Sequence, residues 1–352
     1  MELKDILGTC KLTFKQQIAD LIEMGNKGRL LIAKENSLLT TNTKVTEITS
    51  KLFELEDKDL ETQIKQALKR KPAKVILFEY KGSLTNHVLV LDSLKFDWFI
   101  SLDSTEQQTV SDYCDEKEVF GLVYNLNSNS KWVVSLQNPS AVLANGVEIN
   151  GSSTIDGVDL LPIVGGALAG CPYTNSITVY TFDELELVEM PETITQGQLV
   201  LYNEEEGVRA ANAINTLTTI VGDDTADMKD ITIMEGIRRY KQDLRKAFRV
   251  GYKGRKNTYD NQHLFISAAK GYNEDLTADN VLVLDPEYKN DIFINIDRVR
   301  QLWIAAGKKE EEINAMSDLE ISKLTYKKTM ALKAKVKFLN AIEECEIEVE
   351  MF

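Results

Sequence analysis

The stretch ECEIEVEMF, residues 344–352, alternates without a break between acidic and apolar side chains. A period of two is typical of a β-strand that buries one face and exposes the other to solvent. No turn follows to bring back a partner strand, so we expect this strand to pair with an earlier part of its own chain or with another molecule. Its charged face carries Glu344, Glu346, Glu348 and Glu350, and its apolar face carries Cys345, Ile347, Val349 and Met351.

A second strand of the same kind is predicted near the other end of the chain. Lys11, Thr13 and Lys15 share one face, and Leu12 and Phe14 share the other. This strand is basic outside where the last strand is acidic, and opposite charges facing each other across strands stabilise by about 0.2–1 kcal/mol per pair. We therefore expect both ends to be used for pairing. The alternative is that both only edge the chain's own sheet, because edge strands are often charged to prevent pairing.

The size and composition of the chain narrow its class. With 352 residues, two or three domains are expected, and the net charge of −14 argues against general binding to nucleic acid or anionic membranes. Four cysteines without CxxC spacing and two histidines do not form a zinc motif, so we expect no metal or other cofactor and free thiols in a reducing cytoplasm. No apolar run approaches about 18 residues, so we expect no secretion signal and no membrane span.

Strands and helices alternate through the first part of the chain. Strands are expected at residues 29–34, 75–80, 96–102, 119–124 and 132–136, with helices at 57–71 and 104–118 between them. Residues 85–94 fit either a helix or a strand, and the alternation of their neighbours favours a helix. Ser104 followed by Gln107 predicts a capping box at the start of the last of these helices. This alternation predicts an α/β domain with a mostly parallel sheet.

The one glycine-rich motif is GGALAG at residues 165–170. A phosphate-binding loop needs Lys and then Ser or Thr after the last glycine, whereas Cys171 and Pro172 follow here. The motif lies in a predicted helix over 160–170 that is capped by Asp159 and apolar all round, so we expect it to be buried with its glycines closely packed. Strands are expected next at 177–182 and 198–203, the second in a hairpin with 208–211.

An acidic break, GDDTADMKD at residues 222–230, separates the alternating strands and helices from a region of longer predicted helices, and we take it as a domain boundary. Helices are expected around 237–248 and at 259–275, 298–306 and 309–323, with a short strand at 292–295. Residues 329–339 alternate again and are joined to the terminal strand by a turn around 340–343. The expected domains are an arm strand at 1–20, an α/β domain at 21–221 with a further division near 125–155, a helical domain at 222–330, and a hairpin with arm strand at 331–352.

One local charge cluster opposes the overall charge. Tyr240, Leu244 and Phe248 form the predicted buried stripe of a helix, so the charges should face outward. This surface fits an acidic partner, or is only a solvated helix face; no nucleic-acid module accompanies it. Nine basic residues contribute: Arg238, Arg239, Lys241, Arg245, Lys246, Arg249, Lys253, Arg255 and Lys256.

Catalytic motifs are absent from the sequence. Neither His87 nor His263 sits in a triad pattern. Asp223, Asp224 and Asp227 lack the glycine and glutamate of a calcium loop. With no nucleophile elbow or phosphate loop, we expect a protein that is not an enzyme; a hydrolase on an α/β core is the weaker alternative.

Four longer stretches carry a family resemblance: GGALAGCPYTNSITVYTFDELELVEMP (165–191), GQLVLYNEEEGVRAANAINTLTT (197–219), IRRYKQDLRKAFRVGYKGRKNTYDNQHLFISAAKGYNEDL (237–276) and ALKAKVKFLNAIEECEIEVEMF (331–352). In order and spacing they closely resemble contractile tail sheath proteins, of the compact type found in phages and phage-tail-like bacteriocins of Gram-positive bacteria. Residues 12–35 resemble the family's beginning more loosely, and residues 36–160 only in architecture.

The resemblance implies a structural protein of a virion or phage-tail-like particle, assembled in the bacterial host cytoplasm. Its copies would stack as sixfold rings in a helical sheath around a tail tube, between a baseplate and a tail terminator, and contract to drive the tube into a target cell. Residues 11–15 and 344–351 would be arms that join a sheet of adjacent copies, and residues 329–339 part of the receiving sheet. The helix that carries the nine basic residues is the candidate for the tube-facing surface, with residues 298–309 as the alternative. A tail terminator or another tail structural protein is the alternative within the same particle.

Overall fold

The computed structural model describes residues 28–50, 52–285, 287–343 and 346–348. The chain divides into two compact units. We call residues 25–235 with 340–352 the sheet unit, and the unit that contains residues 236–339 the helical unit. The domain limits expected from the sequence stay a prediction, since compactness alone does not define an independently folding domain.

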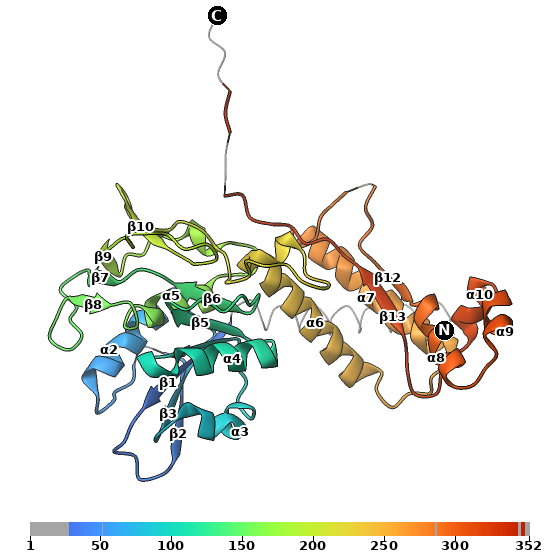
Figure 1. Cartoon of the computed structure of the whole chain (residues 1–352), viewed down its shortest axis with the longest axis horizontal. Helices are drawn as coiled ribbons and strands as arrows, with labels where there is room; N and C mark the ends of the chain where they lie inside the picture. Colours follow the sequence, from blue (N-terminus) through green and yellow to red (C-terminus); the bar gives the residue numbers. More distant parts are fainter. Residues whose placement is uncertain (1–27, 51, 286, 344–345, 349–352) are drawn as a thin grey trace, which may run out of the picture. The chain divides into compact units, whose positions relative to one another are not determined.

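A six-stranded sheet in the order β2-β3-β1-β4-β5-β6 forms the centre of the sheet unit (Figure 1). Its parallel members are β1 (Arg29–Glu35), β3 (Lys74–Tyr80), β4 (Trp98–Ser101), β5 (Phe120–Tyr124) and β6 (Val133–Leu136). The edge strand β2 (Thr43–Ile48) runs antiparallel to β3. The parallel sheet confirms the α/β class predicted from the alternation of strands and helices.

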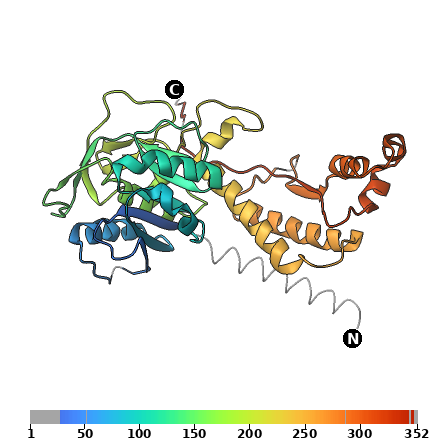
Figure 2. The same ribbon diagram turned by 60° about the horizontal axis from the view of Figure 1, so that its bottom comes forward.

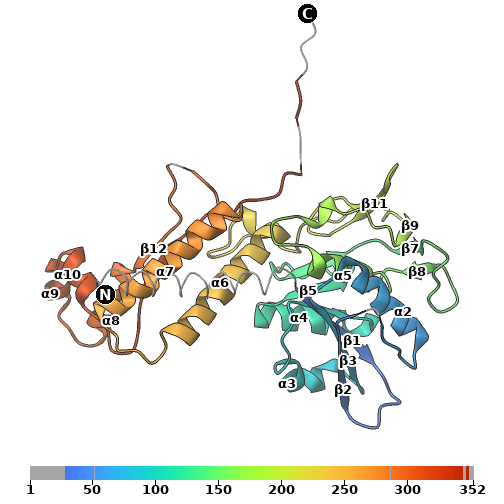
Figure 3. The same ribbon diagram turned by 180° about the vertical axis from the view of Figure 1, so that it is seen from behind.

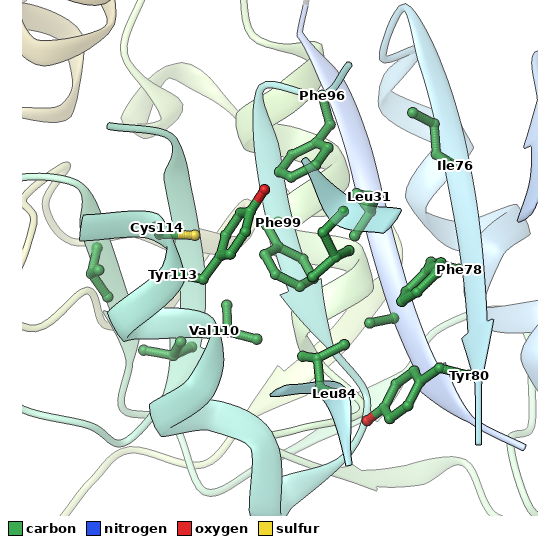
Figure 4. Close-up of a cluster of buried hydrophobic side chains, with 14 residues drawn as sticks. Leu31, Ile76, Phe78, Tyr80, Leu84, Phe96, Phe99, Val110, Tyr113 and Cys114 are labelled. Atoms are coloured by element: carbon green, nitrogen blue, oxygen red, sulfur yellow. The ribbon is translucent and has the colours of Figure 1, made fainter. Parts of the chain in front are cut away.

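Helices cover both faces of this sheet. On one face lie α3 (Val88–Leu91) and α4 (Gln107–Lys117), which pack over alternate side chains of the strands, among them Leu31, Phe78 and Phe99 (Figure 4). On the other face lie α2 (Lys58–Ala67) and α5 (Leu161–Gly170), seen from behind in Figure 3. Successive strand residues point to opposite faces, so the strands are buried on both sides, as parallel strands usually are.

The helix α5 is buried along its whole length, as predicted. A Cβ atom on Gly166 would lie 2.3 Å from the Ala67 carbonyl oxygen of α2. One on Gly170 would lie 2.2 Å from the Arg70 carbonyl oxygen in the short helical turn that follows α2. The glycine-rich motif therefore allows two backbones to touch, which is a packing role.

Smaller sheets complete the sheet unit. The strands β7 (Ser140–Leu143), β8 (Thr154–Asp156) and β9 (Leu185–Val188) form an antiparallel sheet in the order β8-β7-β9. The predicted hairpin is confirmed as β10 (Leu201–Glu204) and β11 (Gly207–Ala210).

Two long helices, α6 (Ile231–Gly251) and α7 (Tyr259–Ala278), lie side by side in Figure 2. Tyr240 stacks on Tyr272, and Phe248 meets Phe265 edge to face. The rest of the helical unit consists of β12 (Asp291–Ile294), α8 (Ile296–Ala305), α9 (Glu310–Ala315), α10 (Asp318–Lys323) and β13 (Leu332–Lys335). None of the helices in the described part of the chain is long and apolar enough to cross a membrane.

Three predictions of capping and of helix continuity are wrong. The helix α4 begins at Gln107 without a side-chain cap, because the Gln107 amide turns back to the Ser101 and Asp103 carbonyls. Asp159 does not cap α5 but accepts a hydrogen bond from Gln63. The helix expected over 309–323 is two helices, because Ser317 and Glu320 form a capping box that starts α10.

Strands were mispredicted at two places. Residues 177–182 do not form a strand; Ile177–Val179 is a short helical turn, which Ser176 caps by accepting a hydrogen bond from the Thr178 amide. Of residues 329–339 only Leu332–Lys335 is a strand, and its partner is β12. Residues 340–343 carry no turn, and residues 346–348 carry no strand in the single chain.

Candidate assembly surfaces

The two-stranded sheet β12–β13 is the first surface of interest. Leu332 and Ala334 pair with Ile294 and Ile292, on the face toward the core of the helical unit. Lys333 and Lys335 project from the opposite face and are exposed. Within the described residues each strand has one partner, so each leaves an edge whose backbone groups are open to a further strand.

The C-terminal segment leaves the helical unit after residue 339, four residues beyond the end of β13. Residues 346–348 are exposed, and the Ile347 side chain keeps 78% of its surface accessible. An isoleucine that alternates with glutamates gains from burial only when a second surface covers it. The remaining predicted arm residues, namely 11–15, Glu344, Val349 and Glu350, lie outside the described residues, so their pairing stays a prediction.

The nine basic residues separate into two groups. Arg238 is buried and Arg239 pairs with Asp243 at 2.8 Å, while the Tyr272 hydroxyl donates to the same carboxylate at 2.6 Å. The prediction that all the charges face outward is therefore wrong for Arg238, and Arg239 is engaged by Asp243, the carboxylate through which Tyr272 links α7 to α6. The fully exposed members cluster at the end of α6 and in the turn after it: Arg245, Arg249, Lys253, Arg255 and Lys256.

Exposed apolar side chains accompany this basic end. Val250 and Leu264 each leave more than half of their surface accessible, and Phe248, predicted to be buried, leaves 39%. The sequence predicted Phe248 on the same buried stripe as Tyr240, but Phe248 lies in the last turn of α6, where its ring meets Phe265 edge to face and stays partly exposed. Apolar side chains among arginines are typical of the centre of a protein–protein interface.

An α/β fold usually binds its ligand at the carboxyl edge of the sheet, where the strand order reverses. In this sheet the order reverses between β1 and β4. Here the Asp103 side chain occupies this position and bonds to neighbouring strands. Its Oδ2 atom accepts hydrogen bonds from the Glu35 amide and from the Tyr80 hydroxyl, both at 2.7 Å. Burial and the Asp103 carboxylate raise the pKa of Tyr80, so the hydroxyl keeps its proton. The network therefore ties β1, β3 and β4 together.

Two of the residues considered for catalysis or metal binding, His87 and Asp224, have structural partners. His87 Nε2 lies 3.0 Å from the Lys81 carbonyl oxygen, and the ring packs between Phe78 and Tyr80. Asp224 forms an ion pair with Lys131. Among the described residues no group of three or more His, Cys, Asp or Glu side chains could hold a metal ion. Sequence reasoning missed Asp103; the only signal was its position just after a predicted strand.

Open strand edges and charged surfaces of this kind are suited to assembly with other protein chains. No family model matches the chain. It is 22% identical over 298 residues to the tail sheath protein of Clostridium phage phiCD119, covering 80% of each chain.

Solved structures share the fold. The sheath tail protein from Desulfitobacterium hafniense superposes with a TM-score of 0.61 at 14% identity, over 77% of this chain and 91% of that one. A chain of the anti-feeding prophage baseplate gives 0.64 at 12% identity over 93% of each chain. The contracted sheath of the extracellular contractile injection system PVC gives 0.62 at 10% identity, over 92% and 91%.

The chain is thus a homologue of tail sheath proteins and has the fold of the sheaths of contractile injection systems. This confirms the resemblance found in the sequence. Its homologues are structural proteins and not enzymes, which also confirms the expectation drawn from the missing catalytic motifs.

Proposed function

We propose that copies of this chain polymerise into the sheath of a contractile tail or phage-tail-like particle, as stacked sixfold rings around a tail tube, and that the sheath contracts to drive the tube through the envelope of a target cell. Assembly would take place in the bacterial host cytoplasm, with the tube, the baseplate and a tail terminator as further partners, and without nucleic acid or membrane. The homology to tail sheath proteins supports this proposal.

The proposal rests on two features of the same chain, the open edge of β12–β13 and the acidic, alternating sequence of the C-terminal arm. The arm of one copy adds to the sheet of the next, where main-chain hydrogen bonds supply affinity and register. Lys333 and Lys335 supply positive charge opposite the arm glutamates. The basic strand at residues 11–15 would enter a neighbouring copy in the same way.

Strand addition suits a sheath that contracts. The contact is heterologous, so it generates an open helical array and not a closed pair. The main-chain bonds persist while the bodies of the copies rotate about the chain beside them. A difference of a few kcal/mol per copy between two packings, multiplied over the array, then supplies the work without a nucleotide.

The contact with the tube would use the exposed basic end of α6. Arg245 and Arg249 lie four residues apart and so share one face of α6, and Lys253 lies in the turn just after the helix ends at Gly251. A polar contact to an acidic tube surface is weakened by salt and can break during contraction. Co-sedimentation with the tube protein of the same particle should fall as salt rises, and should be insensitive to salt in the variant Arg245→Ala/Arg249→Ala/Lys253→Ala.

A charge-swap experiment tests the arm contact. Lys333→Glu/Lys335→Glu should abolish polymeric sleeves in electron micrographs, and adding Glu346→Lys/Glu348→Lys to the same chain should restore them. The matched control Lys308→Glu/Lys309→Glu changes the same charge elsewhere in the helical unit and should leave the sleeves intact. Normal sleeves from the first variant would refute the assignment, and short rings from the wild type would favour a terminator.

A further inference from the structure

The chain from residue 337 to residue 343 is held at both ends. In the helical unit, the Val283 amide donates to the Lys337 carbonyl and the Leu339 amide donates to the Val281 carbonyl, both at 2.9 Å. In the sheet unit, Asn340 Nδ2 donates to Asp230 Oδ2 at 2.8 Å. The boundary between the two units falls between residues 339 and 340, so these two sets of hydrogen bonds lie on either side of it.

The hold on the sheet unit ends at Glu343. Its Oε1 atom accepts hydrogen bonds from the Ser176 hydroxyl at 2.9 Å and from the Thr178 hydroxyl at 3.4 Å. These hydroxyls are held in place without Glu343, because Thr178 Oγ1 lies 3.0 Å from Ser176 Oγ and Ser176 caps the helical turn Ile177–Val179. The donor site for the Glu343 carboxylate is therefore built from residues of the sheet unit alone.

This hold is made by polar groups alone. Ile342, between the two anchoring side chains, is 93% exposed, so hardly any apolar burial adds to the hydrogen bonds. Partly solvated hydrogen bonds contribute little net free energy each. An attachment of this kind is suited to opening and closing, in contrast to a segment fixed by a buried side chain.

We propose that Asn340 and Glu343 form a polar latch that sets where the C-terminal arm leaves the sheet unit. The inference rests on the proposed arm function. With the latch closed, the nine residues after Glu343 could reach at most about 30 Å if fully extended; with it open, the thirteen residues from Asn340 could reach about 43 Å. The latch thus sets how far the arm can extend. When the arm is pulled, the closed latch also bears the force at residues 340–343, so the pairing of β13 with β12 is not loaded first.

The test uses glutamyl endopeptidase on the dispersed full-length chain at low concentration. Cleavage after Glu344 needs several residues on each side in an extended, accessible form, so the closed latch protects this site. Cleavage after Glu348 lies further from the latch and serves as the internal reference. The ratio of the two rates should rise about two- to tenfold in Ser176→Ala/Thr178→Ala, which leaves the arm sequence untouched.

Two further variants keep the test independent of local folding. Asn340→Ala should raise the same ratio, because it removes the other anchor without touching the cap at Ser176. Thr174→Ala removes a nearby exposed hydroxyl that does not contact Glu343 and should leave the ratio unchanged. An unchanged ratio in both latch variants would overturn the proposal. Because the readout needs no sleeves, it separates failure of the latch from failure of the sheath function.

Discussion

The close backbone contact between α5 and α2 gives a sharp stability test at Gly166. In Gly166→Ala the new Cβ atom would lie 2.3 Å from the Ala67 carbonyl oxygen and 2.6 Å from the Ala67 Cα. These are backbone atoms of α2, so no side-chain rotation relieves the clash, and α2 and α5 must move apart. Overpacking of this kind costs about 1–3 kcal/mol, and the two helices would lose further contacts along their length.

The opposing term is the helix propensity of alanine, which favours the substitution by up to about 1 kcal/mol. The free energy of unfolding should therefore fall by about 2 kcal/mol. Urea unfolding followed by the fluorescence of Trp98 and Trp132, both buried in the sheet unit, measures this fall.

Two glycines serve as controls for Gly166. A Cβ atom on Gly165 meets only side-chain atoms of Leu30 and Ile100 at 3.3 Å or more, so Gly165→Ala should be nearly neutral. Gly271 in α7 has nothing within 4 Å, and Gly271→Ala should stabilise the helical unit slightly. If Gly166→Ala is as stable as the wild type, the close approach of α2 and α5 is wrong.

Four further outcomes follow from named contacts. Asp103→Ala should lower the free energy of unfolding by about 3 kcal/mol, because it leaves the Glu35 amide and the Tyr80 hydroxyl without their charged acceptor. Asp103→Asn should lower it less. Equal losses for the two variants in urea unfolding would contradict the role of Asp103 in tying the strands together. Hydrogen bonds from Lys65, the Leu55 amide and Lys58 lower the pKa of Glu61 to about 2. The ionised Glu61 therefore stabilises the folded state above the usual pKa of a glutamate, and this stabilisation is lost as pH falls toward 2. Glu61→Gln should flatten the acid side of a plot of unfolding free energy against pH. Burial and the neighbouring Asp156 raise the pKa of Asp159. The ionised Asp159 therefore destabilises the folded state when pH rises through that pKa. Asp159→Asn should raise the free energy of unfolding at about pH 7 and should lose this advantage in acid. Ser317→Ala should cost about 1 kcal/mol by removing the capping box of α10, seen as a lower melting temperature, with Ser322→Ala near the end of the same helix as the milder control.

The sheet and its covering helices could be predicted from the sequence because their signals are local. Runs such as residues 29–34 and 75–80 are apolar enough to be buried on both faces, and α5 has no polar side. The strand β2 gave no such signal: Thr43–Ile48 mixes charged and polar residues, and it is a strand because β3 offers it an edge. Its pairing is a property of the neighbour, which a local pattern does not contain.

Side-chain hydrogen bonds account for most of the errors. Gln107 matches a capping-box pattern, but its amide is drawn to the Ser101 carbonyl at the end of β4, a contact set by tertiary structure. The basic residues of α6 could be counted from the sequence, yet their division into buried and exposed groups depends on Asp243 and Tyr272, the latter on α7. Sequence pattern therefore located this surface, and packing decided which of its charges are available.

The most direct test of the account is a cryo-EM map of the assembled wild-type chain at a resolution that shows individual strands. We expect residues 344–350 of one copy to lie along the open edge of β12–β13 in a neighbouring copy, with their glutamates beside Lys333 and Lys335. A map in which that edge is empty, or in which the C-terminal residues fold back onto the chain they come from, would contradict it.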